Sequence, residues 1–126
     1  MSMNLELPKT NSTPFVQINE ENGYMKFEGE SYSENIMEFY GVVTKWLGDY
    51  LKSDFNKFTF DCALEYFNSS TSKLLYNMLT DMDNAASDGK DVTVNWYAEK
   101  DNDIIIESGE DFEEELENLT FNLIVK

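Results

Sequence analysis

Residues 58–75, FTFDCALEYFNSSTSKLL, decide the fold because a strand pattern changes there into the start of a helix. From Phe58 to Tyr66 apolar side chains alternate with polar or small ones, with the period of two that is typical of a half-buried strand. Asn68 ends this pattern. Four hydroxyl residues follow directly, and they are Ser69, Ser70, Thr71 and Ser72. The stretch therefore predicts a central strand that leads through a short turn into a helix.

The flanking sequence predicts further strands and helices in alternation. The expected strands are 15–19, 24–27, 92–97, a short one at 104–106, and 121–125, and the expected helices are 34–51, 69–88 and 110–118. Gly29 is expected to end the second strand, and Ser31 or Ser33 to cap the next helix. Residues 1–13 are interpreted as a loose polar lead-in and residues 14–126 as a single domain. The order of elements predicts an α/β fold with helices packed on a mixed β-sheet.

Charge limits the kinds of partner. The chain has 25 Asp and Glu against 9 Lys and Arg, which gives a formal net charge of −16. Binding to nucleic acid or to an anionic membrane surface needs clustered cations, so neither is expected. The first residues lack a secretory signal pattern, and no apolar run is long enough to span a bilayer. A single cysteine also fits a reducing compartment, so we expect a cytoplasmic protein.

Motifs for catalysis or for a cofactor are missing from the sequence. There is no histidine for a Ser–His or Cys–His pair, and Cys62 lies on the apolar face of the expected strand. The acidic run 110–115 is best explained as the solvated face of a helix. Asp101-Asn102-Asp103 does not continue as a calcium loop, because isoleucines follow where oxygen ligands and glycine are needed. We expect no enzymatic activity, no metal and no cofactor, although a Ser–Lys pair through Lys73 stays open.

The hydroxyl-rich turn has two interpretations. One residue, either Asn68 or a serine, is enough to cap the helix by accepting a backbone N–H. Several hydroxyls at a helix N-terminus also suit phosphorylation, because the helix dipole favours added negative charge there. A phosphate would change the global field of so acidic a chain very little, so its effect must be local, at a contact surface.

Four segments resemble one protein family. They are EYFNSSTSKLLYNML (65–79), GESYSEN (29–35), VNWYAEKDND (94–103) and GEDFEEEL (109–116). The first is similar to the phosphoacceptor segment of STAS-type anti-anti-sigma factors. Taken together, their order and spacing resemble the SiaC family of bacterial regulatory phosphoproteins, a STAS-like group, over nearly the whole chain.

The resemblance implies a STAS-like fold and a protein without catalytic activity whose phosphorylation state selects its partner. It implies a SiaB-like serine/threonine kinase and a SiaA-like metal-dependent phosphatase. In its unmodified form such a protein binds and activates a diguanylate cyclase, which raises cyclic di-GMP and promotes aggregation or biofilm growth. The alternative is an anti-anti-sigma-type antagonist that captures an anti-sigma kinase and so controls transcription.

The resemblance places the phosphoacceptor directly after the asparagine at the strand end, which is Ser69. The family's acceptor at this position is a threonine, whereas serine is usual in anti-anti-sigma factors, so Ser70 and Thr71 remain alternatives. The residues expected to bind the partner are Asn68, Ser70, Thr71, Lys73 and, more weakly, Tyr97.

Overall fold

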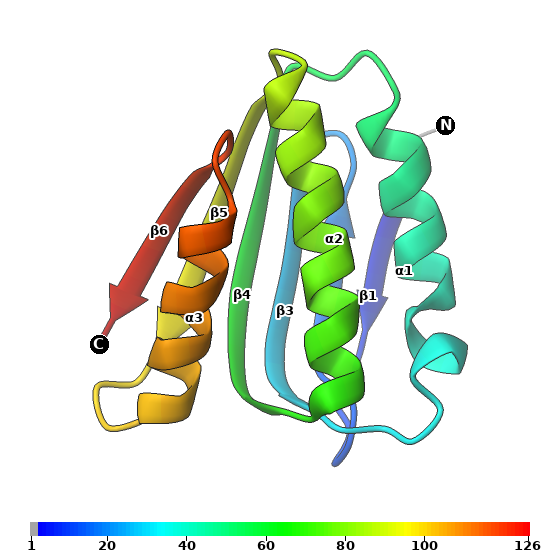
Figure 1. Cartoon of the computed structure of the whole chain (residues 1–126). Helices are drawn as coiled ribbons and strands as arrows, with labels where there is room; N and C mark the ends of the chain where they lie inside the picture. The colour runs from blue at the N-terminus through cyan, green and yellow to red at the C-terminus, as the bar shows by residue number, and fades with distance from the viewer. Residues whose placement is uncertain (1–2) are drawn as a thin grey trace.

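The computed structural model describes residues 3–126 as one six-stranded sheet with three helices (Figure 1). The strands are β1 (Asn4–Leu7), β2 (Phe15–Asn19), β3 (Tyr24–Ser31), β4 (Lys57–Phe67), β5 (Asp91–Ala98) and β6 (Thr120–Val125). The helices are α1 (Ile36–Leu51), α2 (Ser69–Ser87) and α3 (Asp103–Glu115). The strands lie in the sheet in their order along the chain. The expected mixed α/β fold is confirmed.

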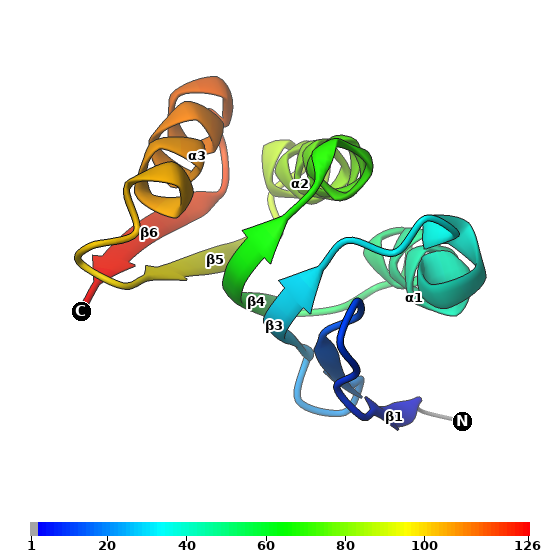
Figure 2. The same cartoon turned by 90° about the horizontal axis from the view of Figure 1, so that it is seen from below.

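The pairing of the strands places the N-termini of the three helices at the same end of the sheet, where the parallel strands have their carboxyl ends. β1, β2 and β3 pair antiparallel, whereas β3, β4, β5 and β6 run parallel. Each parallel connection needs a crossover, and α1, α2 and α3 supply these connections. All three helices cover the same face of the sheet, which leaves the other face open (Figure 2). Their N-termini therefore meet the carboxyl ends of β3, β4 and β5.

The core fills the space between the helices and the covered face. Alternate residues of the central strands are fully buried, among them Phe27, Phe60 and Trp96, which are 0–1% exposed. The buried stripes of α1 and α2 close over them with Trp46, Leu47, Leu75, Leu79 and Met82. Burial raises the pKa of the Cys62 thiol to about 12, so this cysteine is a neutral core residue at physiological pH.

At two positions glycine is required, because neighbouring atoms lie too close to the backbone for a side chain. Gly23, in the β2–β3 turn, has a φ of 62°, and a Cβ there would lie 2.1 Å from the backbone oxygen of Lys57. Gly109 lies inside α3, where a Cβ would come within 2.6 Å of the Trp96 indole. Glycine at this position lets α3 pack directly on β5.

The N-terminal segment differs from the expectation. Residues 1–13 were expected to form a loose lead-in, but Asn4–Leu7 pair with β2 as an edge strand, and the domain begins with β1. Leu5 and Leu7 face the same side as the buried Val16 and Ile18 of β2. A strand of four residues with a single apolar pair carries too weak an alternation to be recognised in sequence.

The expected end of β3 and both expected ends of α3 were wrong, since α3 runs from Asp103 to Glu115. Gly29 does not end β3, because the chain passes it at a φ of 121° and continues to Ser31. Residues 104–106 are not a strand but part of the first turns of α3, which extends well before Glu110. Only Ile105 of the three isoleucines is buried. The side chain of Asn102 caps the helix, because its oxygen accepts the backbone N–H of Ile105. A run of three apolar residues does not by itself distinguish a strand from a helix.

Within residues 3–126, no helix combines the length and the apolar character needed to cross a membrane.

Candidate phosphoacceptor and partner-binding site

The turn that opens α2 is built by Asn68. Its side-chain oxygen accepts the Thr71 N–H at 3.0 Å, and its backbone oxygen accepts the Ser72 N–H at 2.9 Å. Its own backbone N–H donates to the carbonyl of Ser31 at the end of β3, at 3.1 Å. Asn68 is thus the N-cap and connects α2 to the neighbouring strand. The cap does not use the hydroxyls of Ser69 and Ser70, which leaves them available for another role.

Ser69 and Ser70 are the first two residues of α2, and both are exposed. Backbone N–H groups in the first turn of a helix have no intrahelical partner, so this end of α2 favours an anion. A phosphate on Ser69 would therefore be compatible with the folded helix. Lys73 lies four residues further along, on the same face of α2 as Ser69, and is exposed.

Thr71 is placed differently from the two serines. It is 0% exposed, and its hydroxyl lies 2.8 Å from the Ser31 hydroxyl and donates to the Ser31 carbonyl at 3.1 Å. The Ser31 hydroxyl in turn lies 2.7 Å from the hydroxyl of Tyr40 in α1. Burial raises the pKa of Tyr40, so this phenol stays neutral within the buried network. Thr71 joins α2 to β3 and α1 and is inaccessible to a kinase, so of the three candidates only Ser69 and Ser70 are accessible.

Exposed aromatic rings lie beside the acceptor turn. Tyr66 at the end of β4 is 48% exposed, and its ring lies edge-on to Tyr32, with 5.9 Å between the ring centroids. Tyr76, further along α2, is 46% exposed. Tyr76 lines a groove between α2 and α3, whereas Tyr32 and Tyr66 contact each other. Adjacent exposed rings are candidates for contact with another protein. We call Tyr32 and Tyr66 the aromatic patch.

Sequence reasoning missed the aromatic patch and placed Tyr66 on the buried face. The register explains the error: Gly29 pairs with Leu64, but Glu30 pairs with Tyr66, so β4 carries one extra residue at Glu65. This irregularity reverses the alternation, turning Tyr66 outward and Phe67 towards Trp96. The succession of Tyr66 and Phe67 at the strand end is the signal that could have indicated the change.

A groove between α2 and α3 begins at the acceptor turn. Its volume is about 410 Å³, and it is lined by Ser69, Ser72, Lys73 and Tyr76 from α2 and by Asp111, Phe112 and Glu115 from α3. The floor of the groove is apolar, because Phe112 is buried there. Carboxylates stand on the α3 side and a single lysine on the α2 side. The groove therefore combines an apolar floor with charged residues on both sides.

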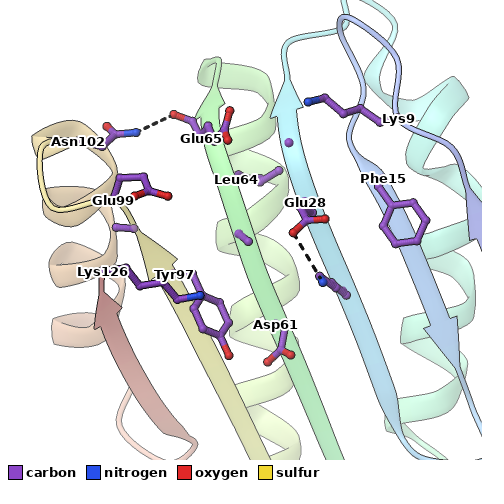
Figure 3. A pocket seen from close by; sticks show the side chains of 14 residues that line it. Lys9, Phe15, Glu28, Asp61, Leu64, Glu65, Tyr97, Glu99, Asn102 and Lys126 are labelled. Atoms are coloured by element: carbon purple, nitrogen blue, oxygen red, sulfur yellow. Dashed lines mark hydrogen bonds and ion pairs between the residues drawn. The ribbon is translucent and has the colours of Figure 1, made fainter.

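Tyr97 does not join this site. It lies on the open face of the sheet, in a separate cavity of about 560 Å³ (Figure 3). There its ring lies beneath the ammonium group of Lys126, 4.8 Å from the ring centroid. Burial, together with the nearby carboxylate of Asp61, raises the pKa of Tyr97. A surface that includes both Tyr97 and Ser69 would have to extend around the edge of the sheet.

The fold and the accessible turn place the chain among α/β domains that carry a candidate phosphoacceptor at the start of a helix. Within residues 3–126, no group of three or more acidic, cysteine or histidine side chains is arranged to hold a metal ion. The chain belongs to the SiaC family of regulatory phosphoproteins, whose sequence profile matches residues 7–126.

Solved structures with the same fold come from Pseudomonas aeruginosa. SiaC of that organism is 27% identical, with a TM-score of 0.90 over 98% of this chain and 99% of the other. A chain in the crystal structure of diguanylate cyclase SiaD in complex with its activator SiaC is 28% identical, with a TM-score of 0.91 over 98% of this chain and 100% of the other.

A relative was also found by sequence. An uncharacterized protein of Pseudomonas aeruginosa strain UCBPP-PA14 is 31% identical over 111 residues, which are 88% of each chain.

Proposed function

We propose that this protein is a cytoplasmic partner-switching regulator, without catalytic activity of its own, that binds and activates a diguanylate cyclase while Ser69 is unmodified. A SiaB-like kinase phosphorylates Ser69, and a SiaA-like phosphatase restores it. The observation that carries the proposal is the exposed Ser69 at the start of α2, next to the aromatic patch, in a chain that superposes on a structure from a cyclase–activator complex. That complex favours a cyclase over an anti-sigma kinase as the partner.

The geometry suggests how a phosphate would act. The buried hydrogen bonds of Thr71 fix α2 against β3, so modification of the neighbouring Ser69 need not disturb the fold. In a complex the phosphate would lie within a contact that also buries aromatic rings. Burying a phosphate without a partner cation costs several kcal/mol, and each 1.4 kcal/mol changes a dissociation constant about tenfold. A cost of about 3 kcal/mol would therefore weaken binding of the cyclase by about a hundredfold.

Lys73 has a defined part in this switch. It lies one helical turn from Ser69 and across the groove from Asp111 and Glu115. A phosphate on Ser69 would attract the ammonium group away from these carboxylates. Because Ser69 lines the same groove, the phosphate would neutralise Lys73 and make the groove more acidic, which gives a second reason for altered partner binding.

The test uses the full-length protein with the diguanylate cyclase of the same organism. We expect the wild type and Ser69→Ala to bind the cyclase in calorimetry and to raise its output of cyclic di-GMP. Ser69→Asp should bind at least about tenfold more weakly while keeping its circular dichroism spectrum and unfolding midpoint. Incubation with the cognate kinase and ATP should add about 80 Da to the wild type and nothing to Ser69→Ala.

The controls separate the parts of the proposal. Ser70→Ala should still gain the same mass, since Ser70 is expected to be spared. Full binding of the cyclase by Ser69→Asp and by the phosphorylated protein would disprove the switch. Failure of the unmodified protein to bind any cyclase of its organism would disprove the assignment of the partner.

A further inference from the structure

The outer edge of β6 carries hydrogen-bonding groups without a partner in the sheet. β6 is the last strand of the sheet, and nothing in residues 3–126 pairs with its far side. Just beyond it, Lys126 directs its backbone towards β5, since its N–H donates to Ala98 O at 2.9 Å and its carbonyl accepts the Lys100 N–H at 2.8 Å. Successive residues of a strand direct these groups to opposite sides. Phe121, Leu123 and Val125 therefore point their N–H and C=O groups outward.

This edge lacks the features that usually prevent strand addition. Natural edge strands are protected by charged side chains, proline, bulges or short length. Residues 118–125, NLTFNLIV, contain neither a charge nor a proline, and Val125 is 46% exposed. The opposite edge differs, because β1 has only four residues, includes Glu6 and is followed directly by Pro8. The contrast indicates that the β6 edge is left open for a partner.

The charge beside β6 indicates what kind of segment fits. α3 packs on β5 and β6, and the stretch 101–125 contains no lysine or arginine. Asp111 and Glu115 line the groove towards α2. With 100° of rotation per residue, Glu110 and Glu113 then lie on the opposite flank of α3, above the free edge of β6. A strand added at this edge would run beside these carboxylates.

We propose that the outer edge of β6 binds an extended segment of a partner protein, rich in lysine or arginine, by adding it as a seventh strand of the sheet. The backbone groups of Phe121, Leu123 and Val125 supply the hydrogen bonds, and Glu110 and Glu113 select for positive charge. A second copy of the chain fits poorly, because antiparallel pairing of two β6 edges would bring two acidic α3 flanks together. This surface lies on the flank of α3 opposite the groove that includes Ser69, and the proposal does not depend on the phosphorylation switch.

The test titrates the ¹⁵N-labelled full chain with an octapeptide of alternating lysine and valine. The matched control peptide carries glutamate in place of lysine. We expect the lysine peptide to shift the amide resonances of β6 and of the facing flank of α3, and the glutamate peptide to shift neither. Binding of the lysine peptide should weaken as NaCl is raised from about 20 to 200 mM.

Two variants examine the two halves of the proposal. Val125→Pro removes one outward donor without touching the β5–β6 hydrogen bonds and should weaken binding about tenfold. Glu110→Lys combined with Glu113→Lys leaves the backbone groups of the β6 edge intact and should weaken binding of the lysine peptide by a similar factor. The control Glu21→Lys with Glu34→Lys changes the net charge equally at exposed positions away from β6 and should bind nearly as the wild type does.

The opposing outcomes are equally clear. Shifts outside β6 and α3, equal binding of the two peptides, or unchanged binding by the Glu110→Lys and Glu113→Lys variant would overturn the proposal. So would a dimer in sedimentation analysis that Val125→Pro dissociates, because the edge would then belong to a second copy of this chain.

Discussion

At the scale of single residues, the hydroxyl residues in the first turn of α2 look alike in sequence but lie in different environments. Ser69 is exposed and its hydroxyl has no hydrogen bond within residues 3–126, whereas Thr71 is completely buried and its hydroxyl is hydrogen-bonded to Ser31. The difference follows from helical geometry, because residues two positions apart on a helix lie on different faces. A phosphate on Ser69, as proposed above, would therefore change the charge of this turn while Thr71 holds the turn in place.

Thr71→Val should destabilise the fold and leave phosphorylation of Ser69 possible. Valine keeps the volume of the side chain but removes the donor to the Ser31 carbonyl, at a cost of about 1–3 kcal/mol for a buried polar group left without its partner. Urea unfolding gives the free energy, and intact mass after kinase treatment gives the modification. The matched change Ser70→Ala, at an exposed position, should alter stability by no more than about 0.5 kcal/mol. If Thr71→Val is as stable as the wild type, the network does not hold the turn.

At the scale of elements, Asp83 holds the start of β6 against α2. Its carboxylate accepts the backbone N–H groups of Asn118 at 2.8 Å and of Leu119 at 3.0 Å, and also the side-chain amide of Asn118 at 3.2 Å. Burial alone would raise the pKa of Asp83, but these hydrogen bonds outweigh it and lower the pKa below its usual value. The carboxylate thus stabilises the fold in its charged form.

The sign of this pKa shift predicts a pH dependence. A lowered folded-state pKa contributes stability that is present above the unfolded-state value of about 4 and is lost as the pH falls through the folded-state pKa. We expect Asp83→Asn to lower the free energy of unfolding by about 1–2 kcal/mol at pH 7 and by clearly less near pH 3. The value at pH 7 should lie at the lower end of this range because the site is partly exposed. Urea unfolding at several pH values measures the difference. Asp81→Asn, on the exposed face of α2, should show neither effect, and a cost for Asp83→Asn that does not change with pH would contradict the explanation.

Gly109→Ala should destabilise the fold, because the added methyl group would force α3 away from the sheet. The added methyl group would lie 2.6 Å from Trp96 and 2.9 Å from Leu123, and the indole cannot swing away freely because its N–H is bonded to the Ile105 carbonyl at 2.9 Å. Overpacking of this kind costs about 1–3 kcal/mol in spite of the better helix propensity of alanine. Gly48→Ala, where a Cβ has open space, should stabilise α1 by up to about 1 kcal/mol. Near-ultraviolet circular dichroism should report the altered setting of Trp96.

The long elements could be predicted from sequence because their patterns are strong. The alternation of β4 and the apolar stripe of α2 gave both elements and the turn between them within a residue or two. Elements determined by tertiary contacts could not be predicted: β1 is held by its pairing with β2, and the first turns of α3 depend on a cap at Asn102. The position of the turn at Asn68 was predictable, but the burial of Thr71 and the exposure of Tyr66 depend on Ser31 and on the irregularity in β4.

At the scale of the whole molecule, the net charge is −16, and the carboxylates form few ion pairs. Across residues 3–126 these are Lys26–Glu28, Lys45–Asp49 and Lys90–Asp54, each with at least one strongly exposed partner. Pairs of this kind contribute about 0–1 kcal/mol each. Repulsion among the remaining carboxylates therefore opposes the folded state more than these pairs support it.

Added salt should consequently stabilise the protein. Raising NaCl from about 10 to 200 mM shortens the screening length from about 30 to 7 Å and weakens repulsion across the surface. We expect the free energy of unfolding in urea to rise by about 1 kcal/mol. Urea is the appropriate denaturant because guanidinium chloride is itself a salt, and chloride is preferable to sulfate, which strengthens apolar burial. Glu110→Gln with Glu114→Gln, which removes two charges from the acidic helix, should be more stable at low salt and gain less from NaCl. A fall in stability with salt would instead mean that the three ion pairs outweigh the repulsion of the carboxylates.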